Sequence, residues 1–389
     1  MNRFSSMFSQ ILQLFSRSEF QGLVKETRAE RHARGFTCWD QFVSMMFCQL
    51  GRAHSLREIC HGLSSCEGKL SHLGIDEAPH RSSLAYANEH RSWELYQKLF
   101  FRLLERCHKD APIQKKFRFK NKLVSLDSTV IDLCVSVFDW AKFRRTKGAI
   151  KLHLLLDHDG YLPCFGVITE GKVHDVKVAW SLSFEPGTVV VDDRGYNDYR
   201  LFSKWTEEQV YFVTRMKDNA SYTIVEHREV PQNRSVIKDQ IIFLNGSGAW
   251  EKCPYPLRRV EVWDEEKQQT LIFLTNHFNF GASTIAAIYK ERWQIELFFK
   301  ALKQNLKIKT FVGTSANAVK IQVWTALIAI LILRYLQLRS KFSWSLSNLV
   351  ALLRMNLFTY RDLWAWLEQP FGLPAQTKTA HHQEALAFR

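Results

Sequence analysis

The chain has 389 residues, and its 46% hydrophobic and 13% aromatic content excludes disorder as the main state. Its length predicts two or three domains. Lys and Arg number 53 against 39 Asp and Glu, a formal charge of +14. A folded protein with this charge attracts polyanions, with nucleic acid the commonest partner and an anionic membrane surface the alternative. The eight cysteines form no Cys-x-x-Cys pair, which favours a reducing cytoplasm over a disulfide framework or a zinc ribbon.

Residues 1–115 are predicted to form a helical domain that binds DNA or dimerises. Apolar residues between Phe4 and Phe15 recur at helical spacing, and Ser55 with Glu58 has the pattern of a capping box. The interrupted apolar spacing at the start is that of an amphipathic helix and not of a signal peptide. A plain helical bundle without a DNA-binding role is the alternative for this region.

Strand patterns begin near residue 121. Apolar and β-branched runs at 123–131, 150–156 and 161–169 predict three strands, and a short helix at 175–182 and a buried strand at 188–191 follow. This order predicts an α/β core whose first part covers residues 116–216. From 211 to 276 strand-like segments recur without helical periodicity. We therefore expect a β-rich insertion over residues 217–282.

Helical periodicity returns near residue 283. We expect a helix within residues 283–312 to complete the core, and residues 313–389 to form a C-terminal helical region. The apolar run at 321–333 lies between Lys320 and Arg334 and is shorter than the roughly 20 residues that span a bilayer. It predicts a buried helix, and no membrane is expected as a partner.

Two aspartates lie in or directly after apolar strands. Asp127 is surrounded by Val124, Leu126 and Val130, where an uncompensated carboxylate would cost several kcal/mol to bury. Asp193 follows the run 189–191, and Gly195 lets the chain bend after it. The structural alternatives are a strand-end Asp that binds local amides and a common turn.

The predicted helix at 283–303 has a polar stripe. At about 100° per residue its polar members fall within about 80° of one another, and Ile295, Phe298 and Leu302 fall on the opposite side. The stripe consists of Tyr289, Arg292, Glu296, Lys300 and Lys303. The alternative is a solvated face with i,i+4 salt bridges. Together with the two aspartates, however, Glu296 would complete three carboxylates suited to divalent cations, and a pair of such ions can drive phosphodiester chemistry.

The motif Tyr289-x2-Arg292-x3-Glu296-x6-Lys303 resembles the YREK signature of DDE transposases of the insertion sequence 4 family. Asp127 and Asp193 match that family's first and second catalytic acids. The resemblance implies an α/β fold: a ribonuclease H-like catalytic core with a β-rich insertion, a helical N-terminal domain and C-terminal helices. It implies that the three acids bind two Mg²⁺ or Mn²⁺ ions. It also implies that Tyr289, Arg292 and Lys303 contact the transposon end, and we expect Lys300 to join them.

The resemblance further implies a bacterial insertion-sequence transposase. Such an enzyme binds terminal inverted repeats and performs cut-and-paste excision and transfer into target DNA through a hairpin. We expect a homodimer in the paired-end complex, in the cytoplasm at the nucleoid. Trp263 and Trp250 are candidates for an aromatic that stacks on a flipped base, with a core position as the alternative. A non-catalytic DNA-binding descendant and a simple ribonuclease H-like nuclease remain as other functions.

Overall fold

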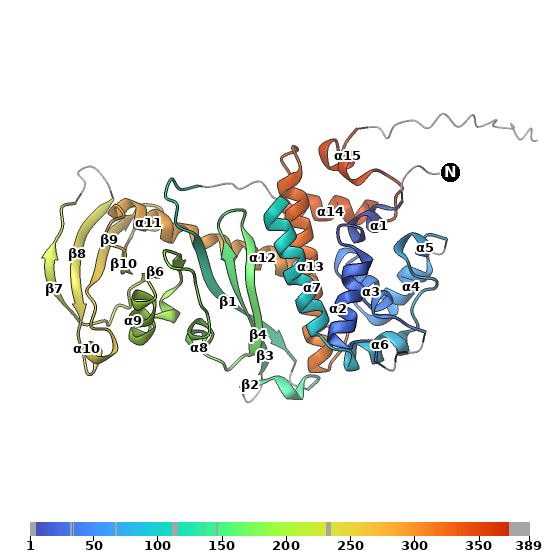
Figure 1. Ribbon diagram of the computed structural model, residues 1–389, viewed down its shortest axis with the longest axis horizontal. Coiled ribbons are helices and arrows are strands. Elements are labelled where there is room, and N and C mark those ends of the chain that lie inside the picture. The colour runs from blue at the N-terminus through green and yellow to red at the C-terminus, as the bar shows by residue number, and fades with distance from the viewer. Residues whose placement is uncertain are drawn as a thin grey trace, which may run out of the picture.

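The computed structural model describes residues 5–31, 33, 35–66, 68–110, 116–134, 136–144, 147–230 and 235–372. The molecule is elongated, with a large sheet in one half and a bundle of helices in the other (Figure 1). The parts of the predicted helical regions that fall on residues 1–4, 111–115 and 373–389 lie outside the described residues.

The centre of the sheet is β1 (Leu123–Leu133). It pairs antiparallel with β3 (Lys147–Asp157) and parallel with β5 (Val189–Val191), which in turn pairs parallel with β6 (Tyr211–Arg215). On the far side of β3 lie β4 (Leu162–Glu170) and the short β2 (Lys142–Arg144). The order β4-β3-β1-β5-β6, with β3 antiparallel to β1, confirms the expected ribonuclease H-like core.

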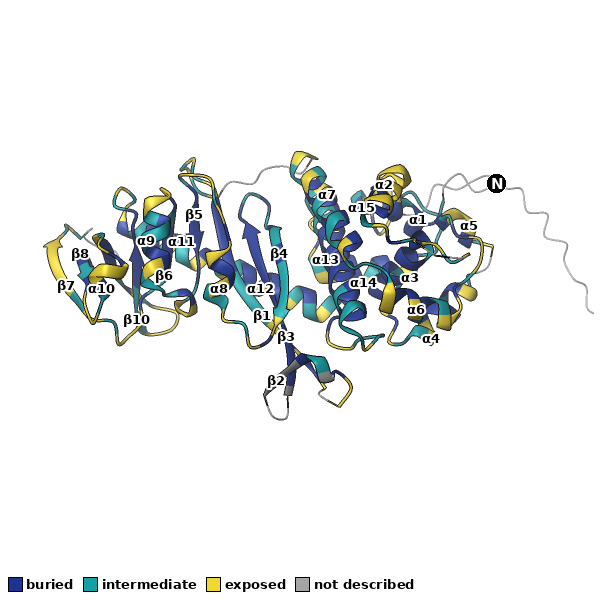
Figure 2. Ribbon diagram, turned by 60° about the horizontal axis from the view of Figure 1, so that its bottom comes forward, coloured by how far each residue is buried: buried dark blue, intermediate teal, exposed yellow. Residues whose placement is uncertain are grey.

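The β-rich segment between residues 217 and 282 continues the same sheet. Its last strand, β10 (Gln269–Thr275), pairs with β6, so that the core and the segment form one sheet of ten strands. Outward from β10 lie β9 (Leu257–Asp264), β8 (Val236–Leu244) and the exposed outer strand β7 (Tyr222–His227; Figure 2). A short helix, α10 (Ala249–Lys252), connects β8 to β9. Because a backbone ladder joins it to β6, this segment has a fixed position relative to the core.

Helices cover both faces of the sheet. α11 (Ala282–Glu291) packs Ile285 and Ile288 on one face, against Leu123, Val191 and Phe273. On the other face, α8 (Asp175–Trp180) and α9 (Tyr199–Glu207) cover a second core that contains Val124, Leu126 and Val190. Since successive strand residues point to opposite faces, the continuous apolar runs of β1 and β5 feed both cores at once.

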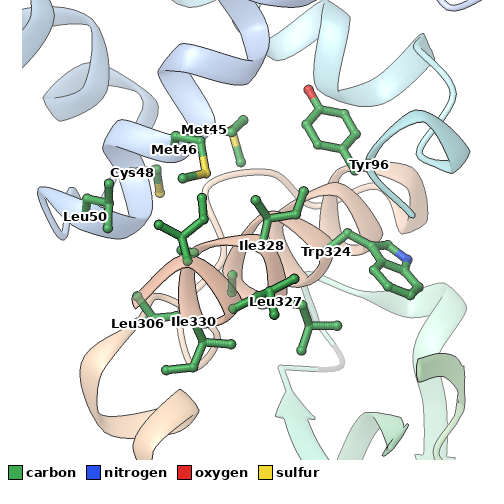
Figure 3. Packing of buried hydrophobic residues seen from close by; sticks show 14 of the residues in the cluster. Met45, Met46, Cys48, Leu50, Tyr96, Leu306, Trp324, Leu327, Ile328 and Ile330 are labelled. Atoms are coloured by element: carbon green, nitrogen blue, oxygen red, sulfur yellow. The ribbon is translucent and has the colours of Figure 1, made fainter. Parts of the chain in front are cut away.

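The helical half is organised around α13 (Ala316–Arg339). Its buried side chains, including Trp324 and Ile328, meet Met45, Met46 and Tyr96 from the N-terminal region (Figure 3). The helices packed directly on it are α3 (Cys38–Leu50), α6 (Arg81–His90), α7 (Glu94–Asp110) and α14 (Leu346–Asn356). Around them lie α1 (Met7–Leu12), α2 (Arg17–Thr27), α4 (Leu56–Ser64), α5 (Leu70–Leu73) and α15 (Leu363–Glu368). The N-terminal and C-terminal segments therefore share one hydrophobic core.

The apolar run 321–333 is a buried helix, as expected. Within the described ranges, α13 is long and apolar enough to cross a membrane by length and composition, because it extends beyond the apolar run at both ends. However, 83% of its most apolar stretch is buried inside the protein. This burial is typical of the central helix of a folded core.

Candidate active site

Strand pairing places Asp127 and Asp193 side by side. In the parallel ladder between β1 and β5, Ser125 lies opposite Val191. Asp127 lies two residues further along β1, and Asp193 lies two residues beyond Val191 in backbone that is still extended, so by alternation both face the same side of the sheet as Ser125 and Val191. Asp193 ends the extended segment, and its Oδ1 accepts a hydrogen bond from Gly195 N at 2.8 Å. Asp192 is fully buried on the opposite face, and this burial raises its pKa well above the usual range.

The third carboxylate comes from α12 (Trp293–Asn305), which packs on β1. The sequence predicts a single helix over 283–303, but this prediction is wrong at Arg292, where the structure divides it into α11 and α12. There the N–H of Arg292 donates to Tyr289 O at 3.0 Å, and that of Ile295 donates to Arg292 O at 3.1 Å. These bonds span three residues and form a tighter turn than an α-helix. Despite the turn, Glu296 still lies near Asp127, because both carboxylates contact Arg292.

Arg292 joins the carboxylates from the helix and the strand. Its Nη1 lies 3.3 Å from Asp127 Oδ2, and its Nη2 lies 2.5 Å from Glu296 Oε1. The side chains of Arg292 and Asp127 are each 16% exposed. Charge-assisted hydrogen bonds of this kind are the stronger class of protein hydrogen bond. The guanidinium also lies 5.6 Å from the centre of the Tyr289 ring, which packs on Phe273.

The electrostatics of Asp127 show that the carboxylates lie within reach of one another. Burial raises the pKa of Asp127 to about 7, while Arg292 and the Ser128 N–H oppose the rise. The charges of Asp193 and Glu296 raise this pKa further. Carboxylates that repel each other in a desolvated site ionise together only when a cation balances them. Arg292 supplies part of that balance, because it lowers the pKa of Asp127 but does not cancel the rise caused by burial.

A groove of about 470 Å³ opens beside these carboxylates. Asp127 and Glu296 lie on its wall with Lys300, Lys303 and Lys309, and its other lining residues are Ser128, Thr129, Phe299 and Gln304. Lys303 Nζ donates to Val130 O at 2.8 Å, which holds this cation at the mouth of the groove. Lys309 was not among the predicted site residues because it lies beyond the helical stripe, in the segment after α12. The groove combines an acidic wall with a basic one.

The carboxylates have the donor chemistry that Mg²⁺ and Mn²⁺ prefer, since all their ligand atoms are oxygens. Among the described residues, no three His, Cys, Asp or Glu side chains surround a common point as metal ligands. The guanidinium of Arg292 lies between Asp127 and Glu296, where a shared cation would lie. In this structure the guanidinium, and not a set of metal ligands, joins the two carboxylates.

The structure does not bring the two predicted tryptophans to this site. β9 runs parallel to β1, so Trp263 lies toward the edge of the sheet that carries Asp193. However, Val260 and Val262 occupy the face under α11, and alternation directs Trp263 to the other face. Trp250 lies on α10, at the opposite edge, with its ring 5.3 Å from that of Phe243.

An exposed tryptophan that the sequence predictions did not include lies one residue after Arg292. Trp293 directly follows Arg292 and is 53% exposed. The unbroken helix that the sequence predicts would place it about 40° from Tyr289, beside the polar stripe. An aromatic residue next to a charged stripe was the available signal, since a buried helix face would have placed it on the opposite side.

Comparison with known proteins agrees with this geometry. A family model described as "Transposase DDE domain" matches residues 118–332, and a domain of unknown function, DUF4372, matches residues 4–76. A protein of Sinorhizobium fredii described as a transposase is 31% identical over 80% of this chain and 87% of its own length. A protein of Geobacillus stearothermophilus described as the transposase of insertion sequence element IS5377 is 27% identical over 88% of this chain and 87% of its own length.

Among solved structures, the piggyBac transposase synaptic complex with hairpin DNA matches 95% of this chain and 82% of that chain. The identity is 11% and the TM-score 0.44, a likeness too distant to carry an argument. The sequence families and the relatives are sufficient without it. Because the DDE model covers more than half of the chain and the curated relatives match most of it, the chain belongs to the family of insertion-sequence transposases with a DDE domain.

Proposed function

We propose that this transposase is catalytically active, with Asp127, Asp193 and Glu296 as its catalytic carboxylates. The observation that carries the proposal is the convergence of Asp127 and Glu296, from a central strand and a helix, on the one guanidinium of Arg292. Asp193 follows the neighbouring strand β5 by two residues, and its charge raises the pKa of Asp127. A merely structural ion pair would give no reason for a third carboxylate at that position.

The proposed cofactor is a pair of Mg²⁺ or Mn²⁺ ions held by these carboxylates. When bound, two such ions activate the attacking oxygen and stabilise the leaving oxygen of a phosphodiester. Arg292 takes part by releasing Asp127 and Glu296 and binding a phosphate of the transposon end instead. Its guanidinium suits both partners because its paired N–H groups match the oxygens of either.

The proposed substrate is DNA: the terminal inverted repeats of the element and then a target site. Support comes from the basic wall of the groove, where Lys300, Lys303 and Lys309 can neutralise phosphates beside the carboxylates. Tyr289, half-buried beside Arg292, can contribute its hydroxyl. Two ends must be held together during excision, so we propose that a homodimer acts in the bacterial cytoplasm, at the nucleoid.

The proposed route passes through a DNA hairpin, which requires a distorted strand and a stacking surface for a displaced base. Of the exposed tryptophans, Trp293 is better supported for this role than Trp250 or Trp263, because it directly follows Arg292 and is exposed. Base stacking on such a ring is worth about 1–3 kcal/mol per base.

The test uses purified protein, a linear DNA that carries the element's ends, a supercoiled target, and either Mg²⁺ or EDTA. We expect metal-dependent end cleavage and joined product, both abolished by Asp127→Ala and by Glu296→Gln. Glu266→Gln, which removes an exposed partner of Lys290, is the matched control and should retain activity. Cleavage that persists in the Asp127 variant would refute the site assignment.

The same assay separates the two competing functions. A DNA-binding descendant would bind the DNA ends without cleaving them. A simple nuclease would cut without joining. The presence of Asp127 and Glu296 on the wall of a basic groove, with Asp193 close enough to affect the pKa of Asp127, favours the transposase over the binding protein.

A further inference from the structure

A buried carboxylate that the proposed chemistry does not use lies one residue before Arg292. Glu291 is 3% exposed and is the last residue of α11. Its Oε1 forms an ion pair with Lys116 Nζ, and its Oε2 accepts a hydrogen bond from the Tyr161 hydroxyl at 2.9 Å. A buried carboxylate is costly unless it is paired, so these contacts define where the end of α11 lies.

The contacts of Glu291 lead back to the strand that carries Asp127. His158 Nδ1 lies 4.0 Å from Glu291 Oε2, and His158 Nε2 lies 2.7 Å from Ser125 Oγ. Ser125 is fully buried and faces the same side of β1 as Asp127, two residues later. Burial lowers the pKa of His158 to about 4, so the imidazole is neutral at physiological pH. Within the described part of the chain, His158 Nδ1 has no hydrogen-bond partner, so the link from β1 to Glu291 is completed by packing: the His158 ring lies 5.5 Å from the ring of Tyr161, whose hydroxyl binds Glu291.

The order serine, histidine, glutamate resembles a nucleophilic triad, but the surroundings exclude that role. The cavity beside His158 and Glu291 measures about 20 Å³, which is room for about one water molecule. Ser125 has no exposed surface. No substrate can reach its hydroxyl, so these residues act structurally, by holding the segments that they join.

Glu291 and its partners hold the turn at Arg292. α11 packs across β5, β6 and the strands of the β-rich segment and reaches the start of β1 at Leu123, whereas α12 packs on β1. The turn between the two helices therefore sets how far Glu296 lies from Asp127. The tether of Glu291 holds this turn against the loop between β3 and β4, which contains Tyr161, and against the segment before β1, which contains Lys116. Displacing a catalytic group by about 1 Å can cost on the order of a hundredfold in rate.

We propose that Glu291 is a positioning residue: through Tyr161, Lys116 and the His158–Ser125 pair it sets the placement of Arg292 and Glu296 over Asp127. This proposal rests on the proposed catalytic function of that site. In this proposed role neither Glu291 nor Tyr161 contacts the DNA or the metal. They act by holding the turn.

The test compares Tyr161→Phe and Glu291→Gln with wild type in single-turnover end cleavage at saturating DNA. Rates are normalised to the folded fraction, measured by circular dichroism at the same temperature. We expect the cleavage rate to fall about threefold in Tyr161→Phe and about tenfold in Glu291→Gln, with the Kd for end DNA changed less than twofold. The double variant should be slower than Glu291→Gln by less than threefold, because the two residues share the contact between the Tyr161 hydroxyl and Glu291 Oε2. The Mg²⁺ concentration for half-maximal rate should rise in both.

Matched controls come from a second tyrosine–glutamate contact, in which Tyr255 OH lies 3.4 Å from Glu207 Oε1 at the far edge of the sheet. Tyr255→Phe and Glu207→Gln should cleave at the wild-type rate. Lower melting temperatures with normal rates per folded molecule in both test variants would overturn the positioning role. If Glu291→Gln does not fold, Tyr161→Phe alone decides. Asp127→Ala is measured in the same assay. If it still cleaves DNA, the proposed function itself is refuted. Normal rates in the Tyr161 and Glu291 variants would refute only the positioning role.

Discussion

Replacing Arg292 with alanine removes a cation that touches both Asp127 and Glu296, and leaves two carboxylates facing each other. Breaking a buried ion pair by removing one partner typically costs 3–5 kcal/mol. The Glu296 side chain is 35% exposed, and Asp127, with a pKa of about 7, can take up a proton. Both effects reduce the cost, so we expect Arg292→Ala to lower the free energy of unfolding by about 3 kcal/mol in EDTA.

Magnesium should restore part of that loss. An ion at ten times its Kd that binds only the folded state stabilises it by about 1.4 kcal/mol. In the wild type the ion must displace the guanidinium, whereas in Arg292→Ala the carboxylates are free to bind it. We therefore expect Mg²⁺ to stabilise the variant by more than it stabilises the wild type.

The assay is urea unfolding followed by tryptophan fluorescence, with EDTA or with Mg²⁺ at constant ionic strength. Arg258→Ala is the matched control, because Arg258 forms a buried bidentate ion pair with Asp239 in the β-rich segment, at 2.9 and 2.6 Å. It should lose comparable stability without gaining a larger response to Mg²⁺. Equal Mg²⁺ effects on the wild type and both variants, or none, would refute the reasoning that Arg292 occupies a cation site.

Three further predictions address the core, the tryptophans and pH. Trp324→Ala should cost about 3–5 kcal/mol in urea unfolding, because Trp324 is fully buried and its ring lies 5.4 Å from that of Phe100; a loss below 1 kcal/mol would contradict this. Trp293→Ala should slow end cleavage while Trp250→Ala does not, with stability changed by less than about 0.5 kcal/mol in each; equal rates would exclude a role for Trp293.

Burial lowers the pKa of His158 to about 4 from its ordinary value of 6.5, so below pH 6.5 the unfolded chain binds a proton that the folded chain does not. Stability should therefore fall as the pH drops from 6.5 to 4, by up to about 1.4 kcal/mol per pH unit, and less steeply in His158→Gln; an unchanged slope in the variant would disprove the assignment.

Local patterns were sufficient for most of the elements and for the choice of the three carboxylates proposed as catalytic. Residues spaced by three and four share a face of any helix, so the side of α12 that carries Glu296, Lys300 and Lys303 follows from spacing alone. Alternation and β-branched runs predicted β1, β3, β4 and β5 in their observed order for the same reason. These features depend on contacts between near neighbours in the chain.

The tertiary structure decided what those residues meet. Arg292 and Asp127 are 165 residues apart, and no local rule predicts that a guanidinium lies between the carboxylates. The pairing of β6 with β10 made the β-rich segment part of the core sheet and directed Trp263 away from the site. The shared core of α3, α7 and α13 likewise joined the two ends of the chain.

The sequence by itself therefore determined the composition of the proposed site: three carboxylates, an arginine, a tyrosine and lysines in a helix-and-strand pattern. Only the tertiary structure showed the turn at Arg292, the buried tether of Glu291 to Tyr161, and the cation that balances Asp127. The physical reason is that periodicity sets which way a side chain points from its own element. Strand register and the packing of distant segments set what lies in front of it.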